Sequence, residues 1–168
     1  MTEFDPFEMC RILNDENVDY VVLGGFAANL LGSPITTRDL DVIPDRAEDN
    51  LDRLGRALTR MNAKIRIAGE PVATKIDGPF LANMPNTLNL VTDHGDMVLV
   101  FSPAGQLAGY EQWNQRAEFA ELEPGLVIAV AALDDIIDSK QAANRAKDHL
   151  SLPYLESLRD EIRRQAGE

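Results

Sequence analysis

Two short motifs separated by 13 residues constrain this chain more than any other feature of its sequence. The first is Gly24-Gly25, which ends the β-favouring run Tyr20–Leu23 and precedes the apolar run Phe26–Leu31. The second is Asp39-Leu40-Asp41, at the start of another apolar run. Together they predict a strand, a glycine turn, a short buried helix and a second strand that carries two carboxylates.

The two motifs suit one kind of ligand. Side chains alternate between the faces of a strand, so Asp39 and Asp41 point the same way while Leu40 points into the core. Two adjacent carboxylates repel each other, and a divalent cation between them removes that conflict. The glycine turn at a helix N-terminus offers free N–H groups to phosphate. The combination indicates a site for a nucleoside triphosphate (NTP) and Mg²⁺ or Mn²⁺, although each motif alone also fits an ordinary turn or a solvated strand face.

The rest of the chain alternates predicted helices and strands. Helices are predicted over about 6–14, 26–31, 47–61, 110–114, 133–143 and 147–164, and strands over 20–23, 40–43, 64–67, 87–91, 97–101, 116–122 and 126–130. Residues 69–86, with three prolines and two glycines, are predicted to be a loop with or without a short helix. This order predicts an α/β (α+β) fold with helices packed on a mixed β-sheet. We expect one domain over 1–168, with its C-terminal helices (about 132–165) packed on the sheet.

The composition limits the classes of molecule that the chain can bind. The chain has 168 residues, 45% of them hydrophobic, and a formal net charge of −12. Such acidity gives no general attraction for nucleic acid, so RNA binding would need a local basic patch. The candidates for that patch are Arg53, Arg56, Arg60, Lys64 and Arg66. An acidic N-terminus, a single cysteine and the lack of a long apolar run lead us to expect a cytoplasmic protein without a membrane partner.

The wording Leu23-Gly24-Gly25, followed by Asp39-Leu40-Asp41-Val42, resembles the signature of the DNA polymerase β-like nucleotidyltransferase superfamily. Within it, the chain looks most like the minimal bacterial enzymes that include the AbiEii/MenT-type toxins. The resemblance implies the nucleotidyltransferase fold and places Gly24 and Gly25 at the triphosphate. It also implies that Asp39 and Asp41 bind the metals, and that a hydroxyl attacks the α-phosphorus while pyrophosphate leaves.

A second block resembles the same toxin-like group. The segment from Ser139 to Asp148 matches its Lys…Arg-x-x-Asp pattern. The resemblance implies that Lys140 binds the triphosphate, that Asp148 positions the triphosphate or a substrate hydroxyl, and that Arg145 lies nearby. An ordinary charged helix face is the alternative for this block alone.

Two residues before the Asp pair are further candidates for phosphate contacts. Thr37 matches a position that is phosphorylated for neutralisation in the toxin relatives, and it also suits the start of a strand. Arg38 is expected either to face the phosphates or to pair with Asp45.

One departure from the pattern concerns the third carboxylate of a two-metal site. The resemblance places that carboxylate where this chain has Val98, in the middle of the strand that follows His94-Gly95. Asp96 points to the same face two residues earlier, about 6.6 Å along a strand. Either Asp96 replaces the missing carboxylate, or the site has only two metal carboxylates.

The leading hypothesis is therefore an Mg²⁺-dependent nucleotidyltransferase, the toxin-like member of a toxin–antitoxin or phage-defence pair. Its expected partners are an NTP, a tRNA as acceptor and a cognate antitoxin, with the oligomeric state left open. One alternative is a small-molecule nucleotidyltransferase of the aminoglycoside or lincosamide type. Another is a degenerate nucleotide-binding module without turnover, which Val98 favours.

Overall fold

A computed structural model describes residues 2–167 of the chain. Its centre is an eight-stranded mixed sheet in the order β4-β3-β5-β6-β2-β1-β8-β7. The strands span β1 Tyr20–Leu23, β2 Asp39–Pro44, β3 Lys64–Ile67, β4 Glu70–Val72, β5 Thr87–Thr92, β6 Gly95–Val100, β7 Glu118–Glu123 and β8 Leu126–Val130. β2 pairs in parallel with β6 and β1 in parallel with β8, while the remaining pairs are antiparallel.

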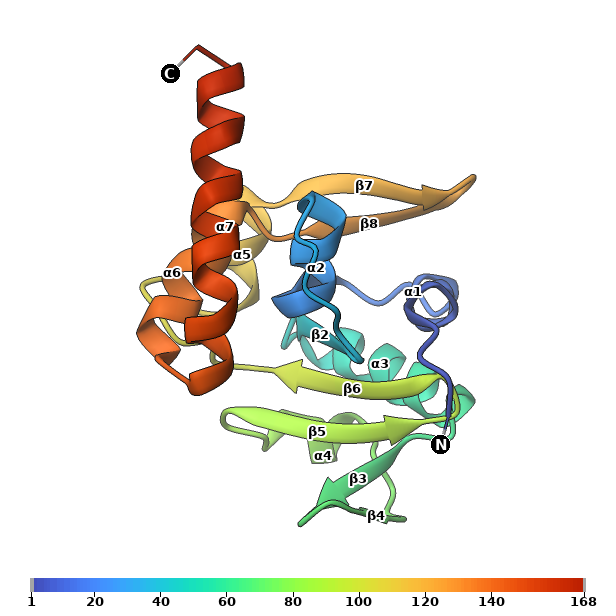
Figure 1. The fold of residues 1–168 in the computed structure, drawn as a ribbon. Helices are drawn as coiled ribbons and strands as arrows, with labels where there is room; N and C mark the ends of the chain where they lie inside the picture. Colours follow the sequence, from blue (N-terminus) through green and yellow to red (C-terminus); the bar gives the residue numbers. More distant parts are fainter. Residues whose placement is uncertain (1, 168) are drawn as a thin grey trace.

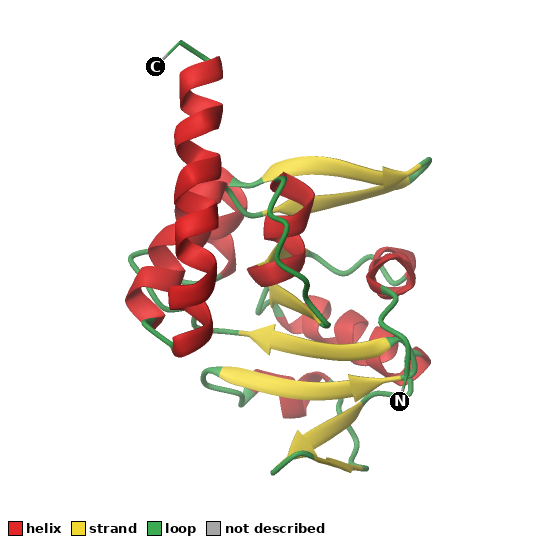
Figure 2. Ribbon diagram, viewed as in Figure 1, coloured by secondary structure: helices red, strands yellow, loops and turns green. Residues whose placement is uncertain are grey.

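Helices cover the sheet (Figures 1 and 2). They are α1 Pro6–Asp15, α2 Gly24–Leu31, α3 Glu48–Arg60, α4 Gly78–Ala82, α5 Tyr110–Arg116, α6 Leu133–Ala143 and α7 Ala146–Gln165. In Figure 1, α2 lies in front of the sheet and α3 behind it, while α6 and α7 lie at the end toward which the β6 arrow points. The C-terminal half of α7 extends beyond the rest of the molecule.

The mixed sheet with packed helices confirms the predicted fold class. Local chemistry explains the start of α1: Asp5 caps the helix by accepting a hydrogen bond from the Glu8 N–H, and proline occupies the first turn. The helical spacing of Leu51, Leu54 and Leu58 buries one face of α3.

Three details differ from the prediction. The segment 69–86 is not all loop, because it contains β4 as well as the short helix α4. α2 begins at Gly24, two residues earlier than predicted. α7 is one residue longer at each end than the predicted 147–164, and it includes Pro153.

Strand register places the two motifs side by side. β1 lies between β2 and β8, and Leu23 of β1 is paired with Asp41 of β2. Asp41 is in turn the register partner of Val98 in β6, and Val98 is the partner of Asn89 in β5. The glycine turn, the Asp pair and the strand that carries Val98 therefore succeed one another across the sheet.

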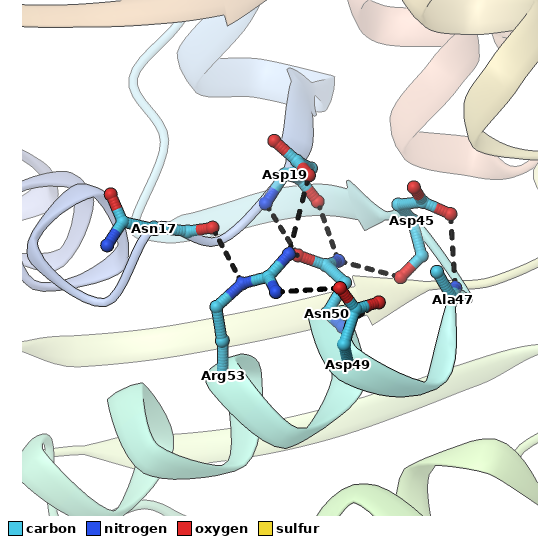
Figure 3. Close-up of polar contacts among 7 residues, drawn as sticks. All are labelled: Asn17, Asp19, Asp45, Ala47, Asp49, Asn50 and Arg53. Atoms are coloured by element: carbon cyan, nitrogen blue, oxygen red, sulfur yellow. Dashed lines mark hydrogen bonds and ion pairs between the residues drawn. The ribbon is translucent and has the colours of Figure 1, made fainter.

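A buried amide holds β1 and β2 in this arrangement. Asn50 of α3 is 0% exposed, and its side chain bonds the backbone of both strands at one end of the pair, next to the partners Tyr20 and Pro44. Its Nδ2 donates to the carbonyl oxygens of Asp19 (3.0 Å) and Asp45 (2.7 Å), and its Oδ1 accepts from the Asp19 N–H (2.7 Å). Figure 3 shows these bonds and the guanidinium of Arg53 over them, which donates to the Asn50 Oδ1 at 3.2 Å.

No helix within residues 2–167 is both long enough and apolar enough to cross a membrane.

Candidate active site

The two motifs and the C-terminal block surround one cavity of about 710 Å³. Most of the predicted site residues line it: Gly24, Gly25, Thr37, Arg38, Asp39, Asp41, Lys140 and Arg145. Asp148 and Asp96 do not belong to its lining. The structure thus brings together residues from β1, α2, β2, α6 and the start of α7.

The Asp pair has the orientation that strand alternation predicts. Leu40 is fully buried, while Asp39 and Asp41, on either side of it, are half-buried and line the cavity. Burial raises the pKa of Asp41 to about 7, the negative charge of Asp39 adds to this effect, and Lys147, Lys140 and Arg145 oppose it. A divalent cation would stabilise the charged form of Asp41, whose pKa is raised in this way.

The glycine turn touches the Asp pair directly. Gly24 has a φ of +71°, and a Cβ at this position would overlap Oδ2 of Asp41. A Cβ at Gly25 would lie 2.8 Å from Oγ1 of Thr37. At Gly24 both the backbone conformation and the close approach of Asp41 require glycine. At Gly25 the close approach of Thr37 does.

Thr37 and Arg38 reach the cavity from the segment that precedes β2. The Thr37 hydroxyl lies 3.2 Å from Oδ1 of Asp39, to which it donates, and 3.3 Å from the Asp39 carbonyl oxygen. Arg38 is exposed, and no carboxylate within residues 2–167 pairs with it, Asp45 included. The structure thus leaves the guanidinium of Arg38 available to an anion.

Asp148 has a different place from the one that the resemblance implied. Its side chain is 0% exposed and caps α7, with Oδ2 accepting from the Arg145 N–H (3.1 Å) and Nε (2.8 Å). Nζ of Lys140 lies 3.5 Å from its Oδ1. Burial opposes ionisation, but the hydrogen bonds from Arg145 and the charges of Arg145 and Lys140 hold the pKa of Asp148 below its usual range. Asp148, which does not line the cavity itself, therefore positions Lys140 and Arg145, which do.

Lys147, in the first turn of α7, adds a further cation to the cavity lining. It lines the cavity, and within the described chain no carboxylate lies in ion-pair distance of its ammonium. Lys147 and Arg38 remain unpaired in a chain with 28 acidic and 16 basic residues. Unpaired cations in so acidic a protein mark the cavity as a place for a polyanion.

The structure does not bring the predicted third carboxylate to the Asp pair. Asp96 is the register partner of Asp39, but its Oδ1 accepts a hydrogen bond from Arg66 at 2.8 Å. Val98 lines the cavity where the third carboxylate was expected. Within residues 2–167, no group of three or more His, Cys, Asp or Glu side chains is arranged to hold a metal ion.

The predicted basic patch is largely neutralised. Arg53 pairs with Asp19 and Asp49, Arg56 with Glu16, Arg60 with Asp15 and Glu16, and Arg66 with Asp96. Lys64 is the member of this set without an ion-pair partner in residues 2–167. Paired side chains of this kind offer little attraction to an RNA backbone.

Sequence reasoning missed the cavity wall formed by β5, β6 and α5. Thr87, Asn89 and Val100 line the cavity, as does Trp113, which is 1% exposed. No motif marks these positions. Thr87, Asn89 and Val100 reach the cavity because β6 lies next to β2 in the sheet and β5 next to β6.

Comparison with known proteins agrees with this architecture. No protein-family model and no curated protein sequence matches the chain. The lincosamide antibiotic adenylyltransferase LnuA, in its lincomycin-bound crystal structure, superimposes with a TM-score of 0.63 at 14% identity, covering 94% of this chain and 99% of LnuA. TM1012 of Thermotoga maritima, described as a candidate nucleotidyltransferase, gives a TM-score of 0.55 at 18% identity, with 97% of each chain covered. The chain thus has the fold of these nucleotidyltransferases.

Proposed function

We propose that this protein is a metal-dependent nucleotidyltransferase, which moves a nucleoside monophosphate from an NTP to an acceptor hydroxyl. The observation that carries the proposal is the contact between the glycine turn and the Asp pair, in a cavity that also holds unpaired cations. Gly24 lies against Asp41, and Arg38 and Lys147 line the same cavity without carboxylate partners.

Each group of residues has a distinct task. The N–H groups at the start of α2, together with Arg38, Lys140 and Lys147, hold the triphosphate. Asp39 and Asp41 would hold Mg²⁺ or Mn²⁺, because two adjacent, half-buried carboxylates that form no ion pair within residues 2–167 fit a hard cation. When bound, that ion supplies charge stabilisation at the attacking and leaving oxygens. Thr37 orients Asp39 through its hydroxyl.

The reaction is an in-line displacement. The acceptor oxygen forms a bond to the α-phosphorus while the bond from that phosphorus to the bridging oxygen breaks. Pyrophosphate leaves and the hydroxyl proton passes to solvent. We propose that the two carboxylates Asp39 and Asp41 suffice, since Asp96 is bound to Arg66.

Two kinds of acceptor fit the proposed reaction, a tRNA and a small molecule. The toxin-like role, with a tRNA 3′ end as acceptor and an antitoxin partner, remains a prediction from the sequence resemblance. The neutralised basic patch argues against a long contact with tRNA. A small-molecule acceptor is the second candidate, because the site is a bounded cavity of about 710 Å³ and because LnuA, of the same fold, is an antibiotic adenylyltransferase.

The test measures NTP binding and transfer separately. Thermal shift with each NTP and Mg²⁺ reports binding, and α-³²P-labelled NTPs report transfer to total tRNA and to a bacterial metabolite extract. We expect Asp41→Asn to abolish transfer and the Mg²⁺-dependent part of the thermal shift. Asp93→Asn, in an exposed turn outside the cavity, serves as the control.

The outcomes separate the hypotheses. If no NTP binds, the proposal is wrong. If an NTP binds but no transfer is detected, the chain is the degenerate nucleotide-binding module instead.

A further inference from the structure

Six of the residues that line the cavity are charged. Two of them are the carboxylates Asp39 and Asp41, and the others are the cations Arg38, Lys140, Arg145 and Lys147. All other residues that line the cavity are uncharged.

Strand order separates the Asp pair from the uncharged residues of β6 and β5. The glycine turn follows β1, the Asp pair lies on the neighbouring β2, and β6 and β5 come next. The register row Asp41, Val98, Asn89 therefore leads from a carboxylate to an apolar side chain and then to an amide. Strands lie about 4.8 Å apart, so the uncharged wall begins one strand from the metal ligands.

The uncharged wall combines apolar surface with a few polar groups. Val98 and Val100 of β6 supply apolar contacts, and Thr87 and Asn89 of β5 supply a hydroxyl and an amide. Trp113 also lines the cavity, and its indole nitrogen is buried without a hydrogen-bond partner in the described structure. An apolar lining with a few placed polar groups is typical of sites for uncharged organic ligands.

The NTP, its metal and the buried Asp148 account for every charged residue of the lining. The triphosphate matches Arg38, Lys140 and Lys147, Asp148 pairs with Arg145 and Lys140, and the metal matches the two carboxylates. A further phosphate on the acceptor would meet no free cation, and an ammonium group would meet no free carboxylate. A charged group moved into such a wall without a partner loses its hydration without compensation.

We infer that the acceptor is an uncharged, hydroxyl-bearing small molecule with an apolar portion, bound against the wall formed by Val98, Val100 and Asn89. This inference rests on the proposed function and narrows its acceptor. The acceptor hydroxyl oxygen forms the new bond to the α-phosphorus and its proton passes to solvent. Pyrophosphate is the leaving group, so no further reactant is needed.

The experiment determines the charge of the acceptor without knowing its identity. An ultrafiltered bacterial metabolite extract is passed over cation and anion exchangers to give uncharged, cationic and anionic fractions. The whole protein is incubated with Mg²⁺, each α-³²P-labelled NTP, and one fraction or total tRNA. We expect label to be transferred to the uncharged fraction. Label on tRNA, label confined to the charged fractions, or no label in the uncharged fraction overturns the inference.

A variant pair tests the wall itself. Asn89→Lys places a cation beside Val98, and we expect it to lower transfer to the uncharged fraction by at least tenfold while the NTP thermal shift persists. Asn83→Lys, on an exposed residue at the end of α4 outside the cavity, is the matched control. Undiminished transfer by Asn89→Lys would show that the acceptor binds elsewhere. If the wild type itself shows no NTP thermal shift, the result instead contradicts the proposed function.

Discussion

Gly24 and Asp41 are in direct contact: the Cα of the glycine lies where any side chain would overlap Oδ2 of the aspartate. The contact joins the end of β1 to the middle of β2, two strands paired in antiparallel register. It also explains why the glycine turn and the Asp pair occur together in the sequence. The turn can approach the metal ligands only if it has no side chain.

Replacement of Gly24 should therefore damage the site more than the fold. Gly24→Ala forces an alanine to a φ of +71° and pushes its methyl group against Asp41. The backbone strain alone costs about 1–2 kcal/mol, and displacement of Asp41 should remove the Mg²⁺-dependent thermal shift. Gly69→Ala is the matched control, since it has a φ of +84° but no atom within 4 Å of the new Cβ. Equal loss of Mg²⁺ response in both variants would contradict a role for the contact.

Asp96 should be dispensable for metal binding. Asp96→Asn removes the partner of Arg66, an exposed ion pair whose contribution to the free energy of unfolding is at most about 1 kcal/mol. We expect the Mg²⁺ affinity, measured by thermal shift or calorimetry, to stay within about twofold of the wild type, whereas Asp39→Asn should abolish it. A loss of affinity in Asp96→Asn equal to that in Asp39→Asn would establish Asp96 as the third metal carboxylate.

Asp148 should link stability to pH and to triphosphate binding. Its pKa is lowered in the folded protein, so its stabilising effect is present above the unfolded-state value of 3.8 and is lost as the pH falls through the folded-state value. Asp148→Asn should therefore be less stable than the wild type at pH 7, and the difference should vanish in strong acid. NTP affinity should also fall, because Lys140 and Arg145 lose their anchor.

A control and a contrary result define this prediction. Asp134→Asn removes an exposed carboxylate of α6 that pairs with Arg163 of α7, so it should alter neither the pH profile nor NTP binding. If the difference in stability between Asp148→Asn and the wild type is the same at every pH, the carboxylate does not stabilise the site through its charge.

Asn50 should contribute to stability far from the cavity. Asn50→Ala leaves the Asp19 N–H and the Asp45 carbonyl oxygen without these partners, while the Asp19 carbonyl oxygen keeps its bond from the Asp45 N–H; we expect a cost of about 2–4 kcal/mol in the free energy of unfolding. Urea denaturation measures this loss. Asn83→Ala, which removes one exposed bond to the Pro79 carbonyl, should cost well under half as much. Equal losses would show that the buried amide does not hold β1 and β2 together.

The sequence by itself determined the local structure around the two motifs. Glycine favours the positive φ of Gly24, and strand alternation buries Leu40 while Asp39 and Asp41 share the other face. The periodicity of α3 and the capping of α1 follow from local chemistry in the same way. Such features depend on residues a few positions apart, so the sequence alone was enough to predict them.

Tertiary structure decided what faces the Asp pair. Whether Asp96 turns toward Asp39 or toward Arg66 depends on where β3 lies, and Arg66 is 30 residues away along the chain. The burial of Asp148 behind Lys140, and the presence of Asn89 in the cavity wall, likewise follow from packing and strand order. Contacts between distant segments are set by how the whole sheet assembles, and no local pattern of residues encodes them.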